Sequence, residues 1–406
     1  MERTRGEAEL CSKDHERHVV FLLNSAFPYQ TGGRETWLAN VTSRLAARGF
    51  PLTVLTLMPK RAQTKTRFDL PASIELRQAA TLHRYRSVAW LMRSYGSLLG
   101  MWYYTWQLYR ELKGLHKRYG GLTVVCLDTV LASTAAVRLR RRLARSTKLV
   151  VSCRGFAADE LSRRFPPAAP MFRWLERRSL TAADEVWTNG LDTQEYYAAR
   201  GYNPIMIGNG ADVERFSSLR PGRPPRHPGD CFQILSVATL RPVKGVDALI
   251  RAAGRLAHTA NQQFEVAFAG KGDAAPYAAL AAKLGIGDRV RFLGEREDVP
   301  ELMARADIVA CLSGGGGMSM ATLEAMAAGT PIVAWDSPVY RQMLTHDQTG
   351  FLVPTGDEEA LARALEEAMA DPGKLQRLAE RARIEVRNYD WAVVTQRVVA
   401  RLEAFA

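Results

Sequence analysis

The sequence predicts an α/β fold with two doubly wound parallel sheets, and three observations lead to this prediction. The chain has 406 residues, which suffices for two domains at roughly 100 to 200 residues per domain. Short apolar runs alternate with helical patterns of about ten to fifteen residues, as in βαβ units. A stretch with four prolines and two glycines, residues 217–230, divides the chain like a linker.

The expected strands follow the apolar runs. Before the linker they cover 18–23, 52–57, 122–127, 149–152 and 185–188; after it they cover 232–238, 264–269, 290–293, 308–312, 331–334 and 351–353. In such sheets ligands bind at the carboxyl ends of the strands, where the strand order reverses. With two sheet domains, the cleft that they face is the expected site.

Composition favours a cytoplasmic globular protein. Apolar residues make up 47% and charged residues 24%, as in average soluble domains. The five cysteines form no C-x-x-C pair, so neither a disulfide framework nor a zinc knuckle fits. The N-terminus is charged and lacks the apolar core of a secretory signal. The longest apolar stretch, 87–109, is interrupted by Arg93 and does not resemble a membrane span.

The net charge of +13 is unevenly placed. Residues 1–230 contain 36 Lys and Arg against 20 Asp and Glu, and residues 231–406 contain 19 against 22. Within the basic part, residues 83–110 mix Trp and Tyr with arginines. An anionic membrane surface is one reading of this pattern; a solvated surface around a core helix is the other. No module for nucleic acid is recognisable.

A glycine turn is the most informative local feature. Residues 310–334 contain a buried strand, four glycines at 314–317, a helical stretch that ends near Gly329 and another strand. Glycines before a helix let backbone N–H groups approach an anion, and the helix dipole adds partial positive charge. The segment therefore predicts a phosphate site, with a loop that holds no ligand as the alternative. The lysine of a P-loop is absent.

The run that starts at Glu324, Glu-Ala-Met-Ala-Ala-Gly-Thr-Pro-Ile-Val, resembles a family 4 (group 1) retaining glycosyltransferase of the GT-B fold, and the resemblance extends over nearly the whole chain. It implies that Glu324 binds the ribose hydroxyls of a nucleotide sugar. It also implies that the preceding turn contacts the donor through Ser313, Gly316, Gly317, Met318, Ser319 and Leu323. In the family, the position of Gly316 holds a glutamate that contacts the donor sugar. Either the sugar is held in another way here, or transfer is slow or lost, or the position has been altered.

A second segment, 234–250, resembles the family signature that supplies cations to the departing diphosphate. Lys244 is in register with it, and Arg241 lies two residues beyond the usual arginine position. Cations fixed beside a leaving group stabilise the charge that develops there. The resemblance implies further donor contacts at Gly270 and Arg296 in the later loops of the same domain and at Gly32 and Gly33 near the start, and an acceptor-side contact at Arg154.

The resulting prediction is a metal-independent hexosyltransferase of the cytoplasm, peripheral at the inner membrane face. It would move a sugar from a UDP- or GDP-sugar to a hydroxyl of a glycan or lipid-linked glycan, without a cofactor and without nucleic acid. The sequence contains neither an Asp-x-Asp nor an H-x3-H motif, so it indicates no metal site. Two alternatives stay open: a nucleotide-sugar-binding protein without turnover, for which Gly316 is the motive, and a GT-B nucleotide-sugar epimerase.

The expected domains follow the family order. They are an acceptor-side domain over 1–216, the linker 217–230, a donor-binding domain over 231–388 and a terminal helix over 389–406 that crosses back to the first domain.

Overall fold

The computed structural model describes residues 17–29, 32–58, 66–79, 96–142, 146–219, 230–260 and 262–405. It divides into two compact units, an N-terminal unit of Met1–Ile207 with Val394–Ala406, and a C-terminal unit of Gly208–Val393. The sequence analysis places the first boundary later, at residue 216. The structure places it earlier because Ala211 and Phe216 are buried in the core of the C-terminal unit. The expected linker falls mainly on 220–229, outside the described residues.

The N-terminal unit contains a seven-stranded sheet in the order β3-β2-β1-β4-β5-β6-β7, with every neighbouring pair parallel. Its strands are β1 (His18–Leu22), β2 (Leu52–Leu57), β3 (Glu75–Ala79), β4 (Leu122–Cys126), β5 (Lys148–Cys153), β6 (Glu185–Thr188) and β7 (Pro204–Met206). Its helices include α1 (Gly33–Ala47), α3 (Gly96–Tyr119), α4 (Leu131–Arg142), α5 (Ala157–Arg164), α6 (Ala169–Thr181), α7 (Leu191–Ala198) and most of α16 (Trp391–Glu403).

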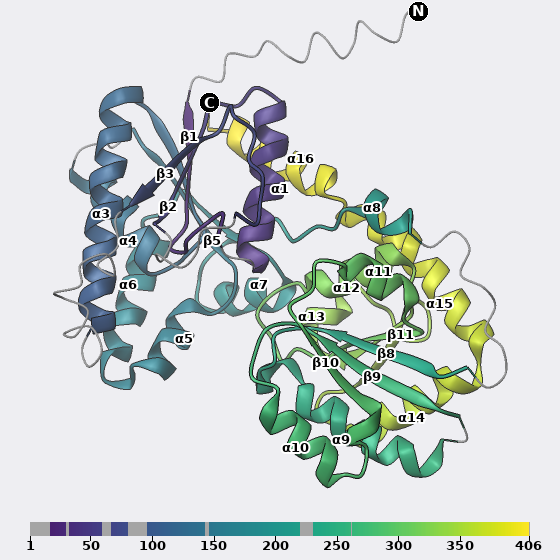
Figure 1. The fold of residues 1–406 in the computed structure, drawn as a ribbon. Coiled ribbons are helices and arrows are strands. Elements are labelled where there is room, and N and C mark those ends of the chain that lie inside the picture. The colour runs from purple at the N-terminus through teal and green to yellow at the C-terminus, as the bar shows by residue number, and fades with distance from the viewer. Residues whose placement is uncertain are drawn as a thin grey trace, which may run out of the picture. The chain divides into compact units, whose positions relative to one another are not determined.

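Helices cover both faces of this sheet (Figure 1). Because successive side chains of a strand point to opposite faces, Val20 and Leu22 of β1 pack in the same cluster as residues of α3 and α4. Phe21 points the other way, and its ring lies 6.3 Å from that of Trp37 in α1. This two-sided burial explains why the central strands are continuous apolar runs.

The C-terminal unit contains a six-stranded parallel sheet in the order β10-β9-β8-β11-β12-β13. Its strands are β8 (Phe232–Val237), β9 (Phe264–Ala269), β10 (Val290–Gly294), β11 (Ile308–Cys311), β12 (Ile332–Asp336) and β13 (Phe351–Pro354). Its helices include α8 (Val213–Ser217), α9 (Val246–Thr259), α10 (Ala275–Lys283), α11 (Val299–Arg305), α12 (Met320–Ala328), α13 (Pro338–Arg341), α14 (Glu358–Ala370) and α15 (Pro372–Glu385).

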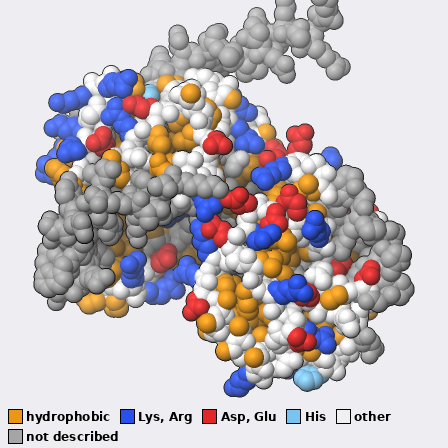
Figure 2. Space-filling view, viewed as in Figure 1, with side chains coloured by type: hydrophobic (Ala, Val, Ile, Leu, Met, Phe, Trp, Pro, Cys, Tyr) orange, Lys and Arg blue, Asp and Glu red, His pale blue; other side chains and the backbone are white. Residues whose placement is uncertain are grey.

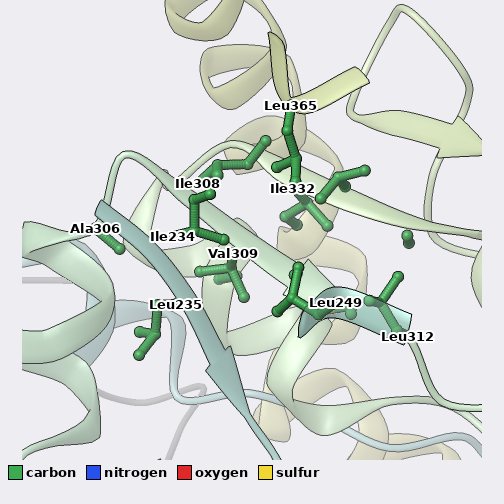
Figure 3. Close-up of a cluster of buried hydrophobic side chains, with 14 of the residues drawn as sticks. Ile234, Leu235, Leu249, Ala306, Ile308, Val309, Leu312, Ile332 and Leu365 are labelled. Atoms are coloured by element: carbon green, nitrogen blue, oxygen red, sulfur yellow. The ribbon is translucent and has the colours of Figure 1, made fainter. Parts of the chain in front are cut away.

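The core of the C-terminal unit is built where the middle strands meet the helices. Ile234 of β8 is the register partner of Ile308 in β11, and both are almost fully buried. Figure 3 shows these two side chains close to Ile332 of β12, with Leu365 of α14 above them. Burying a branched aliphatic side chain of this size stabilises the fold by about 1.5 to 3 kcal/mol. This core fixes the strand ends on which the loops described below are mounted.

The predicted fold class is confirmed: both units are doubly wound α/β structures with parallel sheets. All eleven expected strands are present, and the structure adds β3 and β7, which the sequence analysis missed. Both are outermost strands of their sheet. In the described part of the chain, no helix combines the length and the apolar character that crossing a membrane requires.

Candidate functional site

In the C-terminal unit the strand order reverses between β8 and β11, and the loops after these two strands touch. The Lys244 ammonium, after β8, donates a hydrogen bond of 3.1 Å to the Ser313 hydroxyl, after β11. The backbone N–H of Gly314 donates to the Val243 carbonyl at 2.8 Å. The lysine loop and the glycine turn predicted from the sequence therefore meet at the point where doubly wound sheets bind ligands.

Glycines make this approach possible. Gly245, between Lys244 and helix α9, has φ = +70°, and a Cβ there would lie 2.5 Å from the Cβ of Leu312. A Cβ on Gly270, after β9, would lie 1.9 Å from the Ala238 carbonyl oxygen. Side chains at these positions would push apart the loops that follow β8, β9 and β11. Gly270 thus supports the loop packing beside the lysine.

The surroundings of Lys244 disfavour its positive charge. Burial lowers the pKa of its ammonium, and the nearby positive charge of Arg241 lowers it further. Arg241 itself is exposed at the start of the same loop. An anion bound beside Lys244 would offset both effects, because an opposite charge favours the protonated amine.

Two side chains that the sequence analysis did not assign to the site hold the glycine turn. The hydroxyl oxygen of Tyr340, a buried residue of α13, accepts a hydrogen bond of 2.7 Å from the Ser313 N–H. The side-chain amide of Asn209 donates to the Met318 carbonyl at 2.6 Å. Between these anchors, Gly316 and Gly317 have φ values of +105° and +91°. No neighbour lies within 4 Å of a Cβ built on Gly316, so the backbone conformation, and not lack of space, favours glycine there.

Helix α12 follows the turn and carries Glu324. The helix begins at Met320, three residues after Gly317, and the Ser319 hydroxyl caps it by accepting from the Thr322 N–H. Leu323 is fully buried, so its side chain belongs to the core.

Glu324 has an unusual setting on this helix. Burial raises the pKa of its carboxyl to about 7, although the charge of Arg215 in α8 partly opposes this. Among the described residues, none donates a hydrogen bond to the carboxyl. A carboxylate that is desolvated and lacks donors is typical of a binding site.

Arg296 lies on a neighbouring loop, after β10. Its guanidinium forms a two-pronged ion pair with Asp298, at 2.7 and 2.5 Å, and it is exposed. The Asp298 hydrogen bonds raise the pKa of Arg296. The structure therefore gives this arginine a local partner, and no described contact joins it to Lys244 or Glu324.

The N-terminal unit has its own strand-order reversal, between β1 and β4. The Asn24 side-chain amide, after β1, donates to the Asp128 carboxylate, after β4, at 3.1 Å. The other carboxylate oxygen of Asp128 accepts from the N–H of Val130, just before α4, at 3.1 Å and from that of Ala132, in its first turn, at 3.0 Å. Polar residues directly after two neighbouring strands were the signal that could have identified this pair.

The glycine pair of this unit stands beside a buried carboxylate. Gly32 and Gly33 are exposed, and α1 starts at Gly33. Glu35 in the first turn is buried and accepts a hydrogen bond of 2.6 Å from the Ser25 hydroxyl. A Cβ on Gly32 would lie 2.6 Å from a Glu35 carboxylate oxygen. Glycine at position 32 thus makes room for Glu35.

Arg154 follows β5 at the same edge of the sheet. Its guanidinium carbon lies 4.4 Å from the centre of the Trp37 ring. Burial lowers the pKa of Arg154 to about 9, and the positive charge of Arg34 adds to this, while Glu35 acts in the opposite direction. Arg34 donates to the Asn24 side-chain oxygen at 3.2 Å. Two arginines thus stand at an edge where one of them has lost most of its hydration.

A buried carboxyl lies deeper in this unit. Glu176 of α6 accepts hydrogen bonds from the Thr129 hydroxyl at 2.7 Å and the Tyr197 hydroxyl at 3.0 Å. Burial raises its pKa. The network connects α6 and α7 to the loop after β4 and so supports that edge from below. In the described residues, no group of three or more His, Cys, Asp or Glu side chains is placed to hold a metal ion.

Two family models match the chain. "Glycosyltransferase Family 4" matches residues 31–215, and "Glycosyl transferases group 1" matches residues 223–385. EpsD of Bacillus subtilis (strain 168), which is named as a glycosyltransferase, is 30% identical over 68% of this chain and 74% of its own length. A phosphatidyl-myo-inositol mannosyltransferase of Mycobacterium leprae is 31% identical over 51% of this chain, and the match covers 55% of that relative.

Solved structures agree on the architecture. Sucrose-phosphate synthase from Thermosynechococcus elongatus superposes with a TM-score of 0.76 at 19% identity, over 96% of this chain and all of that one. Anabaena Alr3699/HepE, in complex with UDP-glucose, gives 0.71 at 20% identity over 95% and 99% of the two chains. Two doubly wound units of this kind define the GT-B class. The chain belongs to the group 1 glycosyltransferases of family 4, and it is a glycosyltransferase.

Proposed function

We propose that this glycosyltransferase moves a sugar from a UDP- or GDP-sugar to a hydroxyl of a glycan or lipid-linked glycan, with retention at the anomeric carbon and without a metal. The observation that carries the proposal is the contact of Lys244 with Ser313 at the reversal of the second sheet. It places a desolvated cation beside a glycine turn and the start of a nine-residue helix. Each of these features favours a diphosphate.

The residues would divide the work as follows. Lys244 neutralises the diphosphate as the bond to the sugar breaks, with Arg241 as a second cation on the same loop. Charge that develops on a leaving group is stabilised by cations already in place, so this loop takes the part that a metal ion plays in other transferases. Glu324 accepts hydrogen bonds from the ribose hydroxyls, which its ionised form does with both oxygens.

The acceptor would lie against the N-terminal unit. Arg154 and Arg34 provide positive charge there, and the relatives support an acceptor that carries phosphate: one is named as a phosphatidyl-myo-inositol mannosyltransferase and another as a D-inositol 3-phosphate glycosyltransferase. The choice of UDP is supported by the solved neighbour in complex with UDP-glucose.

Gly316 supports a second candidate, a protein that binds a nucleotide sugar without turning it over. A glutamate at this position would have to adopt φ near +105°, which side chains rarely do. Because position 316 holds glycine, the sugar must be held by other groups here. Release of UDP or GDP in the presence of an acceptor extract separates the two candidates, and a change of the donor into an isomer would instead indicate an epimerase.

Calorimetric titration of the full chain with UDP, GDP, uridine and guanosine tests the donor site. We expect Lys244→Gln to weaken diphosphate binding by about tenfold to a hundredfold and to leave nucleoside binding unchanged, because a charged hydrogen bond is lost. Glu324→Gln should weaken both. Lys283→Gln, an exposed lysine on α10, is the matched control. If Lys244→Gln binds UDP and GDP as tightly as the unaltered protein does, the role assigned to Lys244 is refuted.

Two further measurements complete the test. The anomeric configuration of the product, read by nuclear magnetic resonance, decides between retention and inversion. Turnover in the presence of a chelator decides whether a metal takes part: undiminished turnover supports the proposal, and loss that added Mg²⁺ restores contradicts it.

A further inference from the structure

Three tryptophans of the N-terminal unit are exposed. Trp102 and Trp106 of α3 are 48% and 45% exposed, and Trp174 of α6 is 54% exposed. Trp102, Trp106 and Arg110 follow each other at intervals of four residues, so they lie along one face of the helix. Arg110 is exposed as well. Large aromatic side chains that are about half exposed along one helix face indicate a binding surface.

Helices α3 and α6 border a common apolar hollow, with α4 between them. Met101 and Trp102 of α3 line it together with Leu131 of α4 and Met171 and Phe172 of α6. Trp102 therefore stands at the edge of an apolar depression, not alone on a polar surface. Methionine and aromatic side chains adapt to irregular apolar partners.

Positive charge surrounds these tryptophans. Helices α3, α4, α5 and α6 together contain 13 Lys and Arg and 4 Asp and Glu. The guanidinium carbon of Arg110 lies 5.4 Å from the Trp106 ring centre, and that of Arg178 lies 5.2 Å from the Trp174 ring centre. In Figure 2, Lys and Arg side chains are visible on the left of this unit, above and below the grey atoms. By contrast, α14 of the C-terminal unit contains four glutamates and one arginine.

We propose that this face, defined as the α3–α6 surface with Trp102, Trp106 and Trp174, docks the enzyme on an anionic lipid bilayer. Tryptophan prefers the boundary between headgroups and acyl chains, where its ring is half buried. Lysine and arginine near such a surface are attracted to anionic headgroups. The three exposed indole rings suit the boundary between headgroups and acyl chains, which a polyanion such as nucleic acid does not offer.

Vesicle sedimentation of the full chain without nucleotide sugar tests the surface. Vesicles of phosphatidylcholine with phosphatidylglycerol are compared with vesicles of phosphatidylcholine alone, at low and high salt. We expect binding to the anionic vesicles at low salt, little binding to neutral ones, and a loss of about tenfold or more in the triple variant Trp102→Ala, Trp106→Ala, Trp174→Ala. Replacing Arg110, Arg173 and Arg177 by Gln should weaken binding by about fivefold per charge.

The control variant combines Ile384→Ser with Arg381→Gln and Arg383→Gln on α15, where the side chains are also exposed. It should bind as the unaltered protein does. The proposal fails if the unaltered protein does not sediment with anionic vesicles at low salt, or if the tryptophan variant binds equally well. It also fails if a single-stranded oligonucleotide displaces the protein from vesicles and the oligonucleotide binds the tryptophan variant as well as the unaltered protein.

Folding and donor binding of each variant are checked separately by circular dichroism and by UDP titration. A tryptophan variant that keeps its circular dichroism and UDP affinity but leaves the vesicles identifies the surface as a docking site. If the tryptophan variant unfolds, vesicle binding of the arginine variant tests the proposal instead, because exposed arginines can be replaced without disturbing the core. A failure of the donor proposal would not change the vesicle result, since no donor is present.

Discussion

At the strand-order reversal of the N-terminal unit, side chains join the loops: Asn24 binds Asp128, and Asp128 caps α4. At the corresponding reversal of the C-terminal unit, the joint is made largely by backbone, with Gly314 bonded to Val243 and Gly245 lying against Leu312. Because backbone makes most of this joint, the Lys244 ammonium gives one hydrogen bond to Ser313 and keeps other N–H groups for a ligand. A joint made by side chains is rigid but uses up the polar groups at that edge.

The largest effect is expected at a glycine that lies against the neighbouring loop. Gly245→Ala should destabilise the C-terminal unit by about 2 to 4 kcal/mol, because the new Cβ meets Leu312 and the left-handed backbone disfavours a side chain. Gly285→Ala is the control, since Gly285 has φ = +71° but no atom within 4 Å of its Cβ. It should cost only about 1 to 2 kcal/mol. Urea unfolding compares the two, and equal costs would mean that the contact with Leu312 does not matter.

The side-chain joint is tested by Asp128→Ala. This change removes a helix cap and the partner of Asn24, and we expect it to cost about 2 kcal/mol. Asp371→Ala, which removes a cap from α15 where the Lys374 N–H donates to it, should cost about 1 kcal/mol. Both are measured by urea unfolding. If Asp128→Ala costs no more than the control, the contact between the loops after β1 and β4 adds nothing.

The pH dependence of the C-terminal unit should come in part from Glu324. Its pKa is raised from 4.5 to about 7 in the folded state, so between these values the folded protein holds the proton that the unfolded chain releases. Stability therefore falls as the pH rises through this window. We expect Glu324→Gln to remove about 1 to 2 kcal/mol of this fall, allowing for partial exposure. Parallel pH profiles for the variant and the unaltered protein would contradict the assignment.

The affinity for the donor nucleoside should also depend on the Glu324 carboxyl, but it should rise with pH where stability falls. Ionised Glu324 accepts hydrogen bonds that the protonated acid cannot, so uridine should bind more tightly at pH 8 than at pH 6. The variant Glu324→Gln should lose this dependence. Titration of both proteins with uridine at the two pH values is the measurement.

The smallest effect is expected at the return of α16. Arg401 of this helix donates to the Glu185 carboxylate of β6 at 3.2 Å through Nε, and Glu185 raises the pKa of Arg401. Arg401→Gln should cost about 1 kcal/mol, because Glu185 keeps its bond from Trp187. Arg363→Gln, which breaks an exposed pair within α14, should cost about 0.3 kcal/mol. Equal losses in unfolding experiments would make Arg401 an ordinary surface residue.

The sequence predicted the central strands because burial on both faces makes them apolar without interruption. It missed β3, whose residues Glu-Leu-Arg-Gln-Ala are largely polar, and β7, which has three residues and begins with proline. An edge strand needs a neighbour on one side only and tolerates charge and proline. Its pattern is therefore too weak to be recognised without the sheet.

The same distinction applies to the site. Lys244 and the glycine turn were identified because each is a local pattern of a few residues. Asn24 and Asp128 are 104 residues apart, and Ser313 and Tyr340 are 27 apart. Such pairs arise from the packing of whole elements. A polar residue after a strand, such as Asn24 or Asp128, signals a site residue but does not identify its partner. The sequence thus predicted two loops that meet in the candidate site, and not the side chains that hold these loops in place.

The return of α16 bears on how the protein is made. The N-terminal unit is built from two separate stretches of chain, whereas the C-terminal unit is one continuous stretch. During synthesis the ribosome must complete all of residues 208–393 before the last helix of the N-terminal unit exists. The unit that starts first is therefore finished last, and until then the surface that Val394, Val398 and Leu402 bury stays open to chaperones.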